Sequence, residues 1–265
     1  MKVMLLCGNR YAAREALKIL LAKKVWVVGC VFEESRPNQL SELCDQNNIP
    51  CYTNSQMYEA LEAGELPHFD LGISYLYHRL IKPSLIEFAN DTIINFHPAP
   101  IQVHRGVAAC CYCLLKEYKE WAVTAHYIAA GIDEGDIIME RKFSIEGIQN
   151  GVEAENYIQK QSLQLFQDVI TLFLDDVEIP RKKQDLSRGC YFGRKELEQE
   201  KIINITDDVQ MIDKKIRSLW LPPYHGASIE IGGKRYTLVN EELLQEIAEL
   251  YEKIYRIQDI KNEEG

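Results

Sequence analysis

The sequence predicts an α/β protein with a mainly parallel, doubly wound sheet and a small α+β appendage at its C-terminal end. Over the first half of the chain, short β-like runs alternate with helical runs, and turn residues separate them. Alternation of this kind is typical of a parallel sheet that carries helices on both faces. The pattern changes after Ile179-Pro180, which marks the end of the main domain.

The apolar periodicity places the elements of a Rossmann-like domain over residues 1–180. Strands are expected at residues 3–7, 25–32, 49–52, 71–75 and 92–97, and helices at 12–23, 39–47, 56–63, 83–88 and 107–118. Two further strands, at 121–128 and 136–143, flank a loop that carries Gly131, Asp133 and Gly135. A long amphipathic helix at 153–174 would close this domain.

Residues 181–203 read as a connector, irregular over 184–192, and residues 204–265 as a small subdomain. A helix is expected at 207–219, with Thr206 as its N-cap and Asp207 and Asp208 in its first turn. Residues 227–231 and 234–239 predict a β-hairpin that turns at Gly232-Gly233. Asn240 should cap a last helix from 241 to about 257, and residues 261–265 should form a polar tail.

Composition favours a soluble globular enzyme, since 46% of the residues are hydrophobic and 26% are charged. No apolar run approaches the length that a bilayer crossing requires. The start, Met1 to Cys7, reads as a buried first strand and not as a signal peptide. We therefore expect a cytoplasmic protein that does not associate with membranes.

The charge of the chain disfavours a nucleic-acid partner. The formal net charge is −10, and residues 181–265 hold 15 basic against 16 acidic residues. Proteins that track nucleic acid need a basic surface. Within this part, residues 181–201 hold seven basic against four acidic residues. This basic segment could dock an anionic ligand, or it could be a solvated connector with incidental charge.

Eight cysteines are scattered through apolar stretches, which suits a reducing compartment without disulfides. Cys110, Cys111 and Cys113 include a C-x-x-C pattern, but it lies inside a predicted helix without further metal ligands nearby. We therefore interpret them as buried apolar residues and expect no metal. The first strand leads into Cys7-Gly8-Asn9 and not into a Gly-x-Gly-x-x-Gly turn, so a dinucleotide cofactor is not indicated.

A candidate active site follows the strand at 92–97. Side chains two residues apart on a strand point to the same face, so Asn95 and His97 should emerge together where Pro98 ends the strand. Ligands of such folds bind at the carboxyl ends of the strands. An amide donor beside an imidazole, with the carboxylate of Asp133 available to hold the ring, suits acyl transfer.

These residues resemble the signature of the formyltransferases that depend on 10-formyltetrahydrofolate: Asn-x-His-Pro, a later Gly, then Thr-x-His and Asp-x-Gly. The matching residues here are Asn95, His97, Pro98, Gly106, Thr124, His126, Asp133 and Gly135. The alternative, a hydrogen-bonded structural histidine near a strand end, explains only one of the two separated blocks. The resemblance implies a formyltransferase domain with N10-formyltetrahydrofolate as the formyl donor.

The resemblance implies that Asn95, His97 and Asp133 are catalytic. His97 would take the proton of the attacking amine, and Asn95 with the resulting imidazolium would stabilise the oxyanion. Asp133 would orient His97 or relay protons through water, with Asp136 as an alternative carboxylate. His126 could support the site, or it could be a core histidine.

The family's ligand-binding segments are matched less specifically. Folate would be wrapped by the segment at 74–81 and by the loop before Asp133, with binding residues Tyr77, Arg79, Leu80, Ile81, Ala130, Gly131, Ile132 and Asp133. The expected substrate-binding residues are Asn9, His104, Arg105, Gly106, Tyr191, Arg194, Trp220 and Tyr224. Gly106 would allow close backbone approach.

The distal motifs at 189–195, 220–227 and 233–236 are similar to those of sugar N-formyltransferases that act on nucleotide-linked amino sugars. Trp220 and Tyr224 could stack on a base, and nearby Arg or Lys could meet a diphosphate. A packed hinge is the alternative role of Trp220. The expected substrate is a dTDP-linked amino-dideoxy sugar for lipopolysaccharide O-antigen or a related glycan, with the 3-amino and 4-amino positions both open.

Three other functions fit parts of the sequence. Methionyl-tRNA formyltransferase shares the catalytic blocks, but its substrate demands a broad basic surface, and the residues after 200 are not basic. Glycinamide ribonucleotide formyltransferase ordinarily ends soon after the catalytic domain, which would leave the tail unexplained. A noncatalytic folate- or nucleotide-binding protein would not need the complete Asn95, His97 and Asp133 set.

The exposed edges of the predicted hairpin at Gly232-Gly233 also predict a homodimer.

Overall fold

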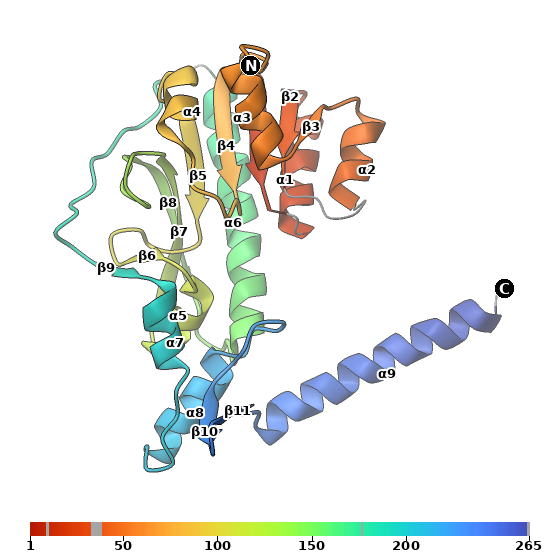
Figure 1. Ribbon diagram of the computed structural model, residues 1–265, viewed down its shortest axis with the longest axis vertical. Helices are drawn as coiled ribbons and strands as arrows, with labels where there is room; N and C mark the ends of the chain where they lie inside the picture. The colour runs from red at the N-terminus through yellow and green to blue at the C-terminus, as the bar shows by residue number, and fades with distance from the viewer. Residues whose placement is uncertain (9–10, 33–38, 176, 264–265) are drawn as a thin grey trace. The chain divides into compact units, whose positions relative to one another are not determined.

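The computed structural model describes residues 1–8, 11–32, 39–175 and 177–263. The chain divides into two compact units (Figure 1). The first unit contains Met1–Gly106, Glu120–Ser144 and Asn156–Tyr191, and the second contains Val107–Lys119, Ile145–Glu155 and Phe192–Gly265. The domain limits expected at residues 180 and 203 remain a prediction.

The first unit is built on a seven-stranded sheet in the order β3-β2-β1-β4-β5-β7-β8. Neighbouring strands from β3 to β5 pair in parallel, β7 is antiparallel to β5, and β8 is antiparallel to β7. This confirms the mainly parallel, doubly wound sheet. The strands are β1 (Lys2–Cys7), β2 (Trp26–Val31), β3 (Cys51–Tyr52), β4 (Leu71–Tyr75), β5 (Ile93–His97), β7 (Glu120–Tyr127) and β8 (Ile137–Ser144).

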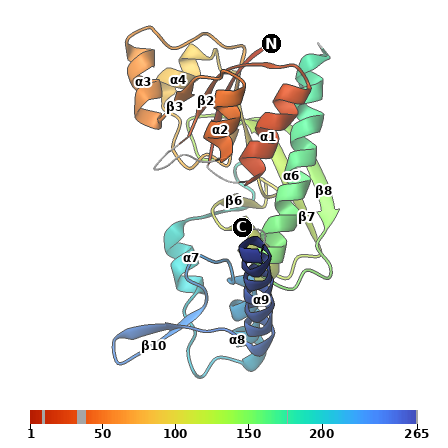
Figure 2. The ribbon, with the colours of Figure 1, turned by 90° about the vertical axis from the view of Figure 1, so that its right-hand side faces the viewer.

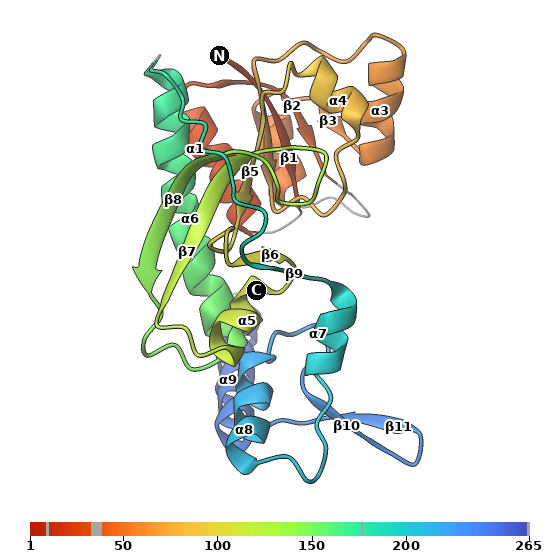
Figure 3. The same ribbon diagram turned by 90° about the vertical axis from the view of Figure 1, so that its left-hand side faces the viewer.

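Helices cover both faces of this sheet (Figures 2 and 3). On one face α1 and α6 lie side by side, joined by a hydrogen bond of 2.7 Å from Lys23 Nζ to Thr171 Oγ1. The ring of Phe166 on α6 packs against those of Tyr75 and Phe96, with centroids 5.3 and 5.0 Å away. The helices of this unit are α1 (Tyr11–Ala22), α2 (Gln39–Gln46), α3 (Asn54–Glu62), α4 (Pro83–Phe88) and, from Asn156 onward, α6 (Gly151–Leu174).

The opposite face is covered by α3 and α4 (Figure 3). Met4 and Leu6 of β1 pack there with Met57 of α3 and Leu85 of α4 in one buried cluster. These residues alternate along β1 with Val3 and Leu5, which are also fully buried. A strand buried on both faces reads as a continuous apolar run, which is why the sequence signal of β1 was strong.

The second unit contains helices α5, α7, α8 and α9, with α5 against α8, and a two-stranded hairpin. The predicted hairpin turn at Gly232-Gly233 is confirmed, and both residues have positive φ, 58° and 75°. A two-residue turn of this kind requires positive φ at both positions, which glycine adopts without strain. The elements are α5 (Ala109–Leu115), α7 (Arg194–Glu200), α8 (Val209–Ser218), β10 (Ser228–Ile231), β11 (Lys234–Thr237) and α9 (Glu241–Glu263).

The predicted starts of two helices, α8 and α6, were wrong. Helix α8 is capped by Asp208, which accepts from Gln210 N, and not by Thr206. The preceding Asp207 instead accepts from Asn204 N in a turn of its own. Helix α6 begins two residues early because Asn150 Oδ1 accepts from Val152 N at 3.0 Å.

The end of the chain was also predicted incorrectly. Asn240 caps α9 as expected, accepting from Leu243 N at 3.1 Å. The helix then continues to Glu263, past the end expected near residue 257 and into the expected polar tail. No glycine or proline stands between 257 and 263 to end it.

The expected connector is partly ordered. Strand β9 (Cys190–Phe192) pairs with β6 (His104–Gly106) within a stretch that the sequence predicted as irregular. Helix α7 follows directly, and Glu196 accepts from Gly193 N at its start. Of the helices in the described ranges, none combines the length and the apolar content needed to cross a membrane.

Candidate active site

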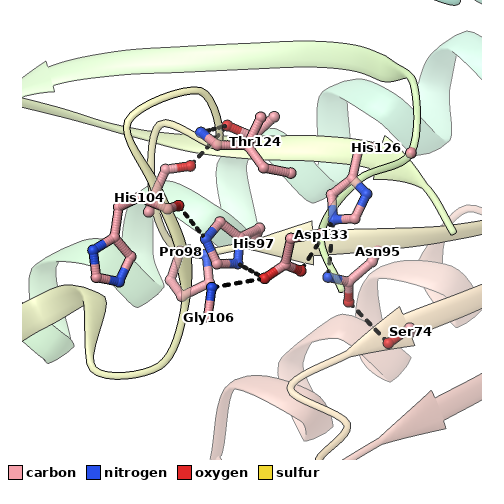
Figure 4. A network of polar contacts seen from close by, with 12 residues as sticks. Ser74, Asn95, His97, Pro98, His104, Gly106, Thr124, His126 and Asp133 are labelled. Carbon is pink, nitrogen blue, oxygen red and sulfur yellow. Dashed lines mark hydrogen bonds and ion pairs between the residues drawn. The ribbon is translucent and has the colours of Figure 1, made fainter. Parts of the chain in front are cut away.

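Three polar side chains form a row across neighbouring strands at the carboxyl end of β5 (Figure 4). Ser74 of β4 and His126 of β7 are the register partners of Asn95 on β5. Ser74 Oγ donates to Asn95 Oδ1 at 2.9 Å, and Asn95 Nδ2 donates to His126 Nε2 at 3.1 Å. The amide of Asn95 is therefore held at both its oxygen and its nitrogen.

The protonation of His126 follows from its partners. Its Nδ1 lies 2.8 Å from the carbonyl oxygen of Tyr127. A carbonyl oxygen only accepts, so Nδ1 carries the ring proton. Nε2 accepts from Asn95 Nδ2, so the two ring nitrogens have different partners.

His97 is buried beside this row, with 3% of its surface exposed. Its Nε2 donates to the backbone oxygen of His104 at 2.9 Å, and its Nδ1 lies 3.4 Å from Asp133 Oδ2. Burial lowers the pKa of His97 below its ordinary value, although the negative charge of Asp133 opposes this shift. The ring therefore rests neutral, and its basic nitrogen Nδ1 faces the carboxylate.

Asp133 joins the two imidazoles. Its Oδ2 also accepts from Gly106 N at 3.0 Å, and its Oδ1 lies 3.6 Å from His126 Nε2. Burial alone would raise the pKa of Asp133, but the contacts with His126, His97 and Gly106 N lower that pKa to about 2. The carboxylate is thus ionised at neutral pH and stabilises positive charge on His97.

Two glycines allow these contacts. Gly106 has φ 99°, a conformation that side-chain-bearing residues rarely adopt, and its N–H points to Asp133. A Cβ atom at Gly135 would lie 1.7 Å from the carbonyl oxygen of Tyr127. The loop that carries Asp133 therefore closes against the end of β7 only with glycine at position 135.

Thr124 positions the turn that follows β5. It is the register partner of His97, and its Oγ1 donates to Ala99 O at 2.8 Å and accepts from Ile101 N at 3.3 Å. Trp121 Nε1 donates to Pro98 O at 2.9 Å. Both side chains fix the backbone that leads from His97 to the loop of His104.

Gln184 also supports the site, and sequence reasoning missed it. Its Nε2 donates to the backbone oxygens of Asp133, at 3.0 Å, and of Gly135. These contacts span about fifty residues of chain, and no local pattern signals them. Ser74 was expected only in the folate segment, although a polar residue inside the buried strand β4 does indicate a special role.

The expected folate residues lie on two loops at the carboxyl ends of strands. Tyr77, Arg79, Leu80 and Ile81 follow β4, and Ala130, Gly131 and Ile132 follow β7. Leu80 is 75% exposed and Ile132 43% exposed, whereas Tyr77 donates through its hydroxyl to Asn54 at 2.6 Å. Both loops thus present apolar side chains to solvent.

The expected substrate residues are distributed over both units. The first unit holds His104, Arg105, Gly106 and Tyr191, and the second holds Arg194, Trp220 and Tyr224. Asn9 lies outside the described residues. His104 and Arg105 are buried, at 2% and 9% exposure, and His104 reaches His97 through its carbonyl oxygen. Tyr191 and Tyr224 are about half exposed.

Of the two candidate carboxylates, Asp133 contacts the imidazoles. Asp136 contributes its backbone oxygen, which accepts from Tyr127 N at 2.9 Å. Among the residues that the structure describes, no group of three or more His, Cys, Asp and Glu side chains is arranged to hold a metal. Burial raises the pKa of Cys113 to about 12, so this thiol is protonated at neutral pH.

The arrangement combines a base with a hydrogen-bond donor. His97 can accept a proton at Nδ1, where Asp133 would stabilise the imidazolium. The Asn95 amide carries two hydrogens, of which His126 takes one, so the other can donate to an oxyanion. These are the groups that acyl transfer to an amine requires.

Comparisons with known proteins relate the chain to formyl transferases. The model of the family described as formyl transferase matches residues 23–170, more than half of the chain. The chain is 25% identical over 250 residues to the methionyl-tRNA formyltransferase of Syntrophomonas wolfei, covering 90% of this chain and 79% of that protein. It is 24% identical over 208 residues to the GDP-perosamine N-formyltransferase of Brucella melitensis, covering 77% and 78%.

A solved structure shares the fold. The N-formyltransferase from Helicobacter canadensis, in complex with folinic acid and dTDP-3-aminofucose, superposes with a TM-score of 0.69 at 21% identity. The match covers 88% of this chain and 85% of that one. At this identity the likeness concerns the fold, which is a Rossmann-like formyltransferase fold.

Proposed function

The chain belongs to the formyl transferase family, and we propose that it transfers a formyl group from N10-formyltetrahydrofolate to the amine of a dTDP-linked amino-dideoxy sugar. The observation that carries this proposal is the contact of His97 with Asp133 beside the doubly held amide of Asn95. The set supplies a base, a carboxylate partner and an oxyanion donor in one place. A role in lipopolysaccharide or related glycan synthesis goes with this substrate.

In the proposed mechanism the substrate amine attacks the formyl carbon. His97 receives the proton of the amine at Nδ1, and Asp133 holds the imidazolium that results. The free amide hydrogen of Asn95 donates to the formyl oxygen as negative charge develops there. The proton then passes from His97 to the folate nitrogen as the bond between that nitrogen and the formyl carbon breaks, which releases tetrahydrofolate and the N-formylated sugar. Because His97 and Asp133 are nearly buried, this charge develops where water does not screen it.

The loops beside the site suit a folate. The exposed apolar side chains of Leu80 and Ile132 offer surface that a flat pterin can cover. The bound donor would supply the activated formyl group. The chain's own residues would orient that group between Asn95 and His97.

The second candidate is methionyl-tRNA formylation, because the relatives of this chain include such enzymes, among them the one from Syntrophomonas wolfei. Two observations favour the sugar. The net charge is −10, and residues 204–265 hold eight basic against twelve acidic residues. An acidic appendage repels a phosphate backbone. The Brucella protein is named for a GDP-linked sugar and the Helicobacter protein is in complex with a dTDP-linked sugar. The choice of dTDP as the nucleotide is therefore a more specific proposal than the choice of a nucleotide sugar.

We also propose a homodimer without nucleic-acid or membrane partners. Ile231 and Tyr236 of the hairpin are 58% and 49% exposed, and all four residues of β11 are exposed. An uncovered strand edge with apolar residues is a natural pairing surface for a second copy. Light scattering at micromolar concentration tests this, and a monomer there would remove the proposal.

One assay tests the function as a whole. Purified protein is incubated with N10-formyltetrahydrofolate and, separately, dTDP-linked 3-amino and 4-amino sugars, a GDP-linked amino sugar and charged initiator tRNA. We expect a formylated dTDP-sugar as the main product, identified by mass spectrometry. Efficient formylation of the tRNA and of no sugar would contradict the proposal.

A further inference from the structure

Arg105 is a buried cation that has no counter-ion among the residues that the structure describes. It lies in the middle of β6 and exposes 9% of its surface. Its Nη2 donates to the backbone oxygen of Leu186 at 3.5 Å, which is the long limit for a hydrogen bond. Nη1 is buried and has no hydrogen-bond partner among the described residues.

An uncompensated guanidinium is costly to bury. Arginine stays protonated at any physiological pH, so the charge cannot be avoided by titration. Buried charges are ordinarily paired with an opposite charge, because the loss of hydration is otherwise not offset. Arg105 is therefore a built donor for an anion.

The guanidinium is tied to the catalytic network through the backbone on both sides. The carbonyl oxygen of His104 accepts from His97, and the N–H of Gly106 donates to Asp133. A second buried polar atom without a partner in the described part of the chain, Gln184 Oε1, belongs to the side chain that holds the Asp133 loop. Residues 184–186 thus contact both Arg105, through the backbone oxygen of Leu186, and the Asp133 loop, through Gln184.

We propose that Arg105 binds the phosphate attached to the sugar of the nucleotide substrate, and that Gln184 Oε1 accepts a hydrogen bond from a sugar hydroxyl. This inference rests on the proposed function. In a nucleotide-linked amino sugar, one sugar ring separates the reacting amine from the first phosphate. The side chain of Arg105 begins between His104, which holds His97, and Gly106, which holds Asp133. An extended arginine side chain is about as long as one sugar ring is wide.

The chemistry of the group favours phosphate over the other anion in the reaction. The planar guanidinium can donate to two phosphate oxygens at once. The folate carboxylates lie at the far end of that molecule from its formyl group, beyond the aminobenzoyl ring. An anion next to the catalytic residues therefore belongs to the nucleotide sugar.

The test compares dTDP binding by the wild type and by Arg105→Met, which keeps the length of the side chain and removes its charge. Arg141→Met is the matched control, because Arg141 lies on β8 and pairs with Asp168 at 3.4 Å and Gln161 at 3.0 Å. Losing a charged hydrogen bond should weaken dTDP binding by roughly 10- to 100-fold in Arg105→Met. The KM for the nucleotide sugar should rise in step while the KM for folate stays unchanged.

The other outcomes separate the two proposals. Equal dTDP affinity in the wild type and Arg105→Met overturns the Arg105 assignment alone, as does a rise in the folate KM instead. A wild type that binds no nucleoside diphosphate removes the proposed substrate together with this inference. If circular dichroism shows Arg105→Met unfolded, a crystal structure of the wild type with dTDP decides: phosphate oxygens on Nη1 support the assignment, and phosphates elsewhere overturn it.

Discussion

Asn95 and His126 are direct register partners on antiparallel strands β5 and β7, and Asn95 Nδ2 donates to His126 Nε2 at 3.1 Å. Because His126 Nδ1 donates to Tyr127 O, a neutral His126 needs the nitrogen of the amide, and not its oxygen, on its side. Ser74 Oγ then meets the amide oxygen. These two hydrogen bonds orient the amide of Asn95 and leave its second N–H hydrogen for chemistry.

We expect Ser74→Ala to lower kcat by roughly 2- to 10-fold, as the loss of one neutral hydrogen bond allows. The KM for both substrates should change little, since Ser74 acts through the orientation of Asn95. Ser74→Thr, which keeps the hydroxyl, should recover most of the activity. Ser162→Ala removes another buried hydroxyl, on α6, and should leave kcat unchanged. Equal effects at both positions would mean that Ser74 is only structural.

Substitution of the reacting groups should have much larger effects. Asn95→Ala or His97→Asn should reduce kcat/KM by about 10²- to 10³-fold, the usual cost of losing one oxyanion donor. Far-ultraviolet circular dichroism and dTDP affinity should stay close to those of the wild type. Either variant retaining more than about a tenth of the activity would contradict the mechanism on the same grounds.

The carboxylate is tested by ranking two neighbours. Asp133→Asn should lose activity on the scale of the His97 variant, because Asp133 lies 3.4 Å from His97 Nδ1. Asp136→Asn should lose far less, since Asp136 contributes a backbone contact. The reverse ranking of kcat values would move the catalytic role to Asp136.

The activity should also depend on pH in a defined direction. Burial lowers the pKa of His97 below 6.5, so the neutral base persists at lower pH than in a free histidine. The acid limb of kcat/KM should therefore lie below pH 6.5 and fall as His97 takes up a proton. Asp133 raises the pKa of His97, so Asp133→Asn should move that limb to still lower pH. A limb that moves upward would contradict this assignment.

The sequence predicted that Asn95 and His97 emerge together because their relationship is local. The two residues share a strand face, since side chains alternate along a strand with a period of two. Gly106 and Gly135 were recognisable through the resemblance to the formyltransferase signature, and the structure shows why glycine suits both positions: a positive φ at Gly106 and close approach to the Tyr127 carbonyl oxygen at Gly135. A constraint of this kind determines the residue type at a single position, so it can be recognised in the sequence.

The contacts that sequence reasoning missed depend on tertiary structure. Gln184 contacts the Asp133 loop although about fifty residues separate them in the sequence, so only the folded chain brings them together. The order of α7 and β9 comes from pairing with β6 and from a local cap at Gly193, within a stretch rich in charge and glycine. The wrong cap at Thr206 arose because three adjacent residues can each cap a helix, and packing selects one.

Chelation is expected to leave turnover unchanged, because the proposed chemistry uses only side chains and the formyl donor. The assay is the formyl-transfer rate with and without excess EDTA. Loss of activity that zinc restores would point back to Cys110, Cys111 and Cys113. Serine substitution of Cys110 and Cys113 would then abolish the zinc effect.

The last prediction separates sugar from tRNA at the nucleotide. If Trp220 or Tyr224 stacks on the base, replacement by Ala should raise the KM for the nucleotide sugar by roughly 5- to 150-fold, since a stacked base contributes about 1–3 kcal/mol. The folate KM should stay nearly constant. Trp26→Ala is the control, because Trp26 is 64% exposed at the start of β2, away from the carboxyl ends of the strands.

Salt dependence provides the independent arm of that comparison. A tRNA substrate releases counterions on binding, so its kcat/KM would fall steeply between low and physiological salt. A nucleotide sugar makes few phosphate contacts, and its turnover should vary little over the same range. Steep salt dependence together with unchanged KM in the Trp220 and Tyr224 variants would favour the tRNA substrate, even with Asn95, His97 and Asp133 all proved catalytic.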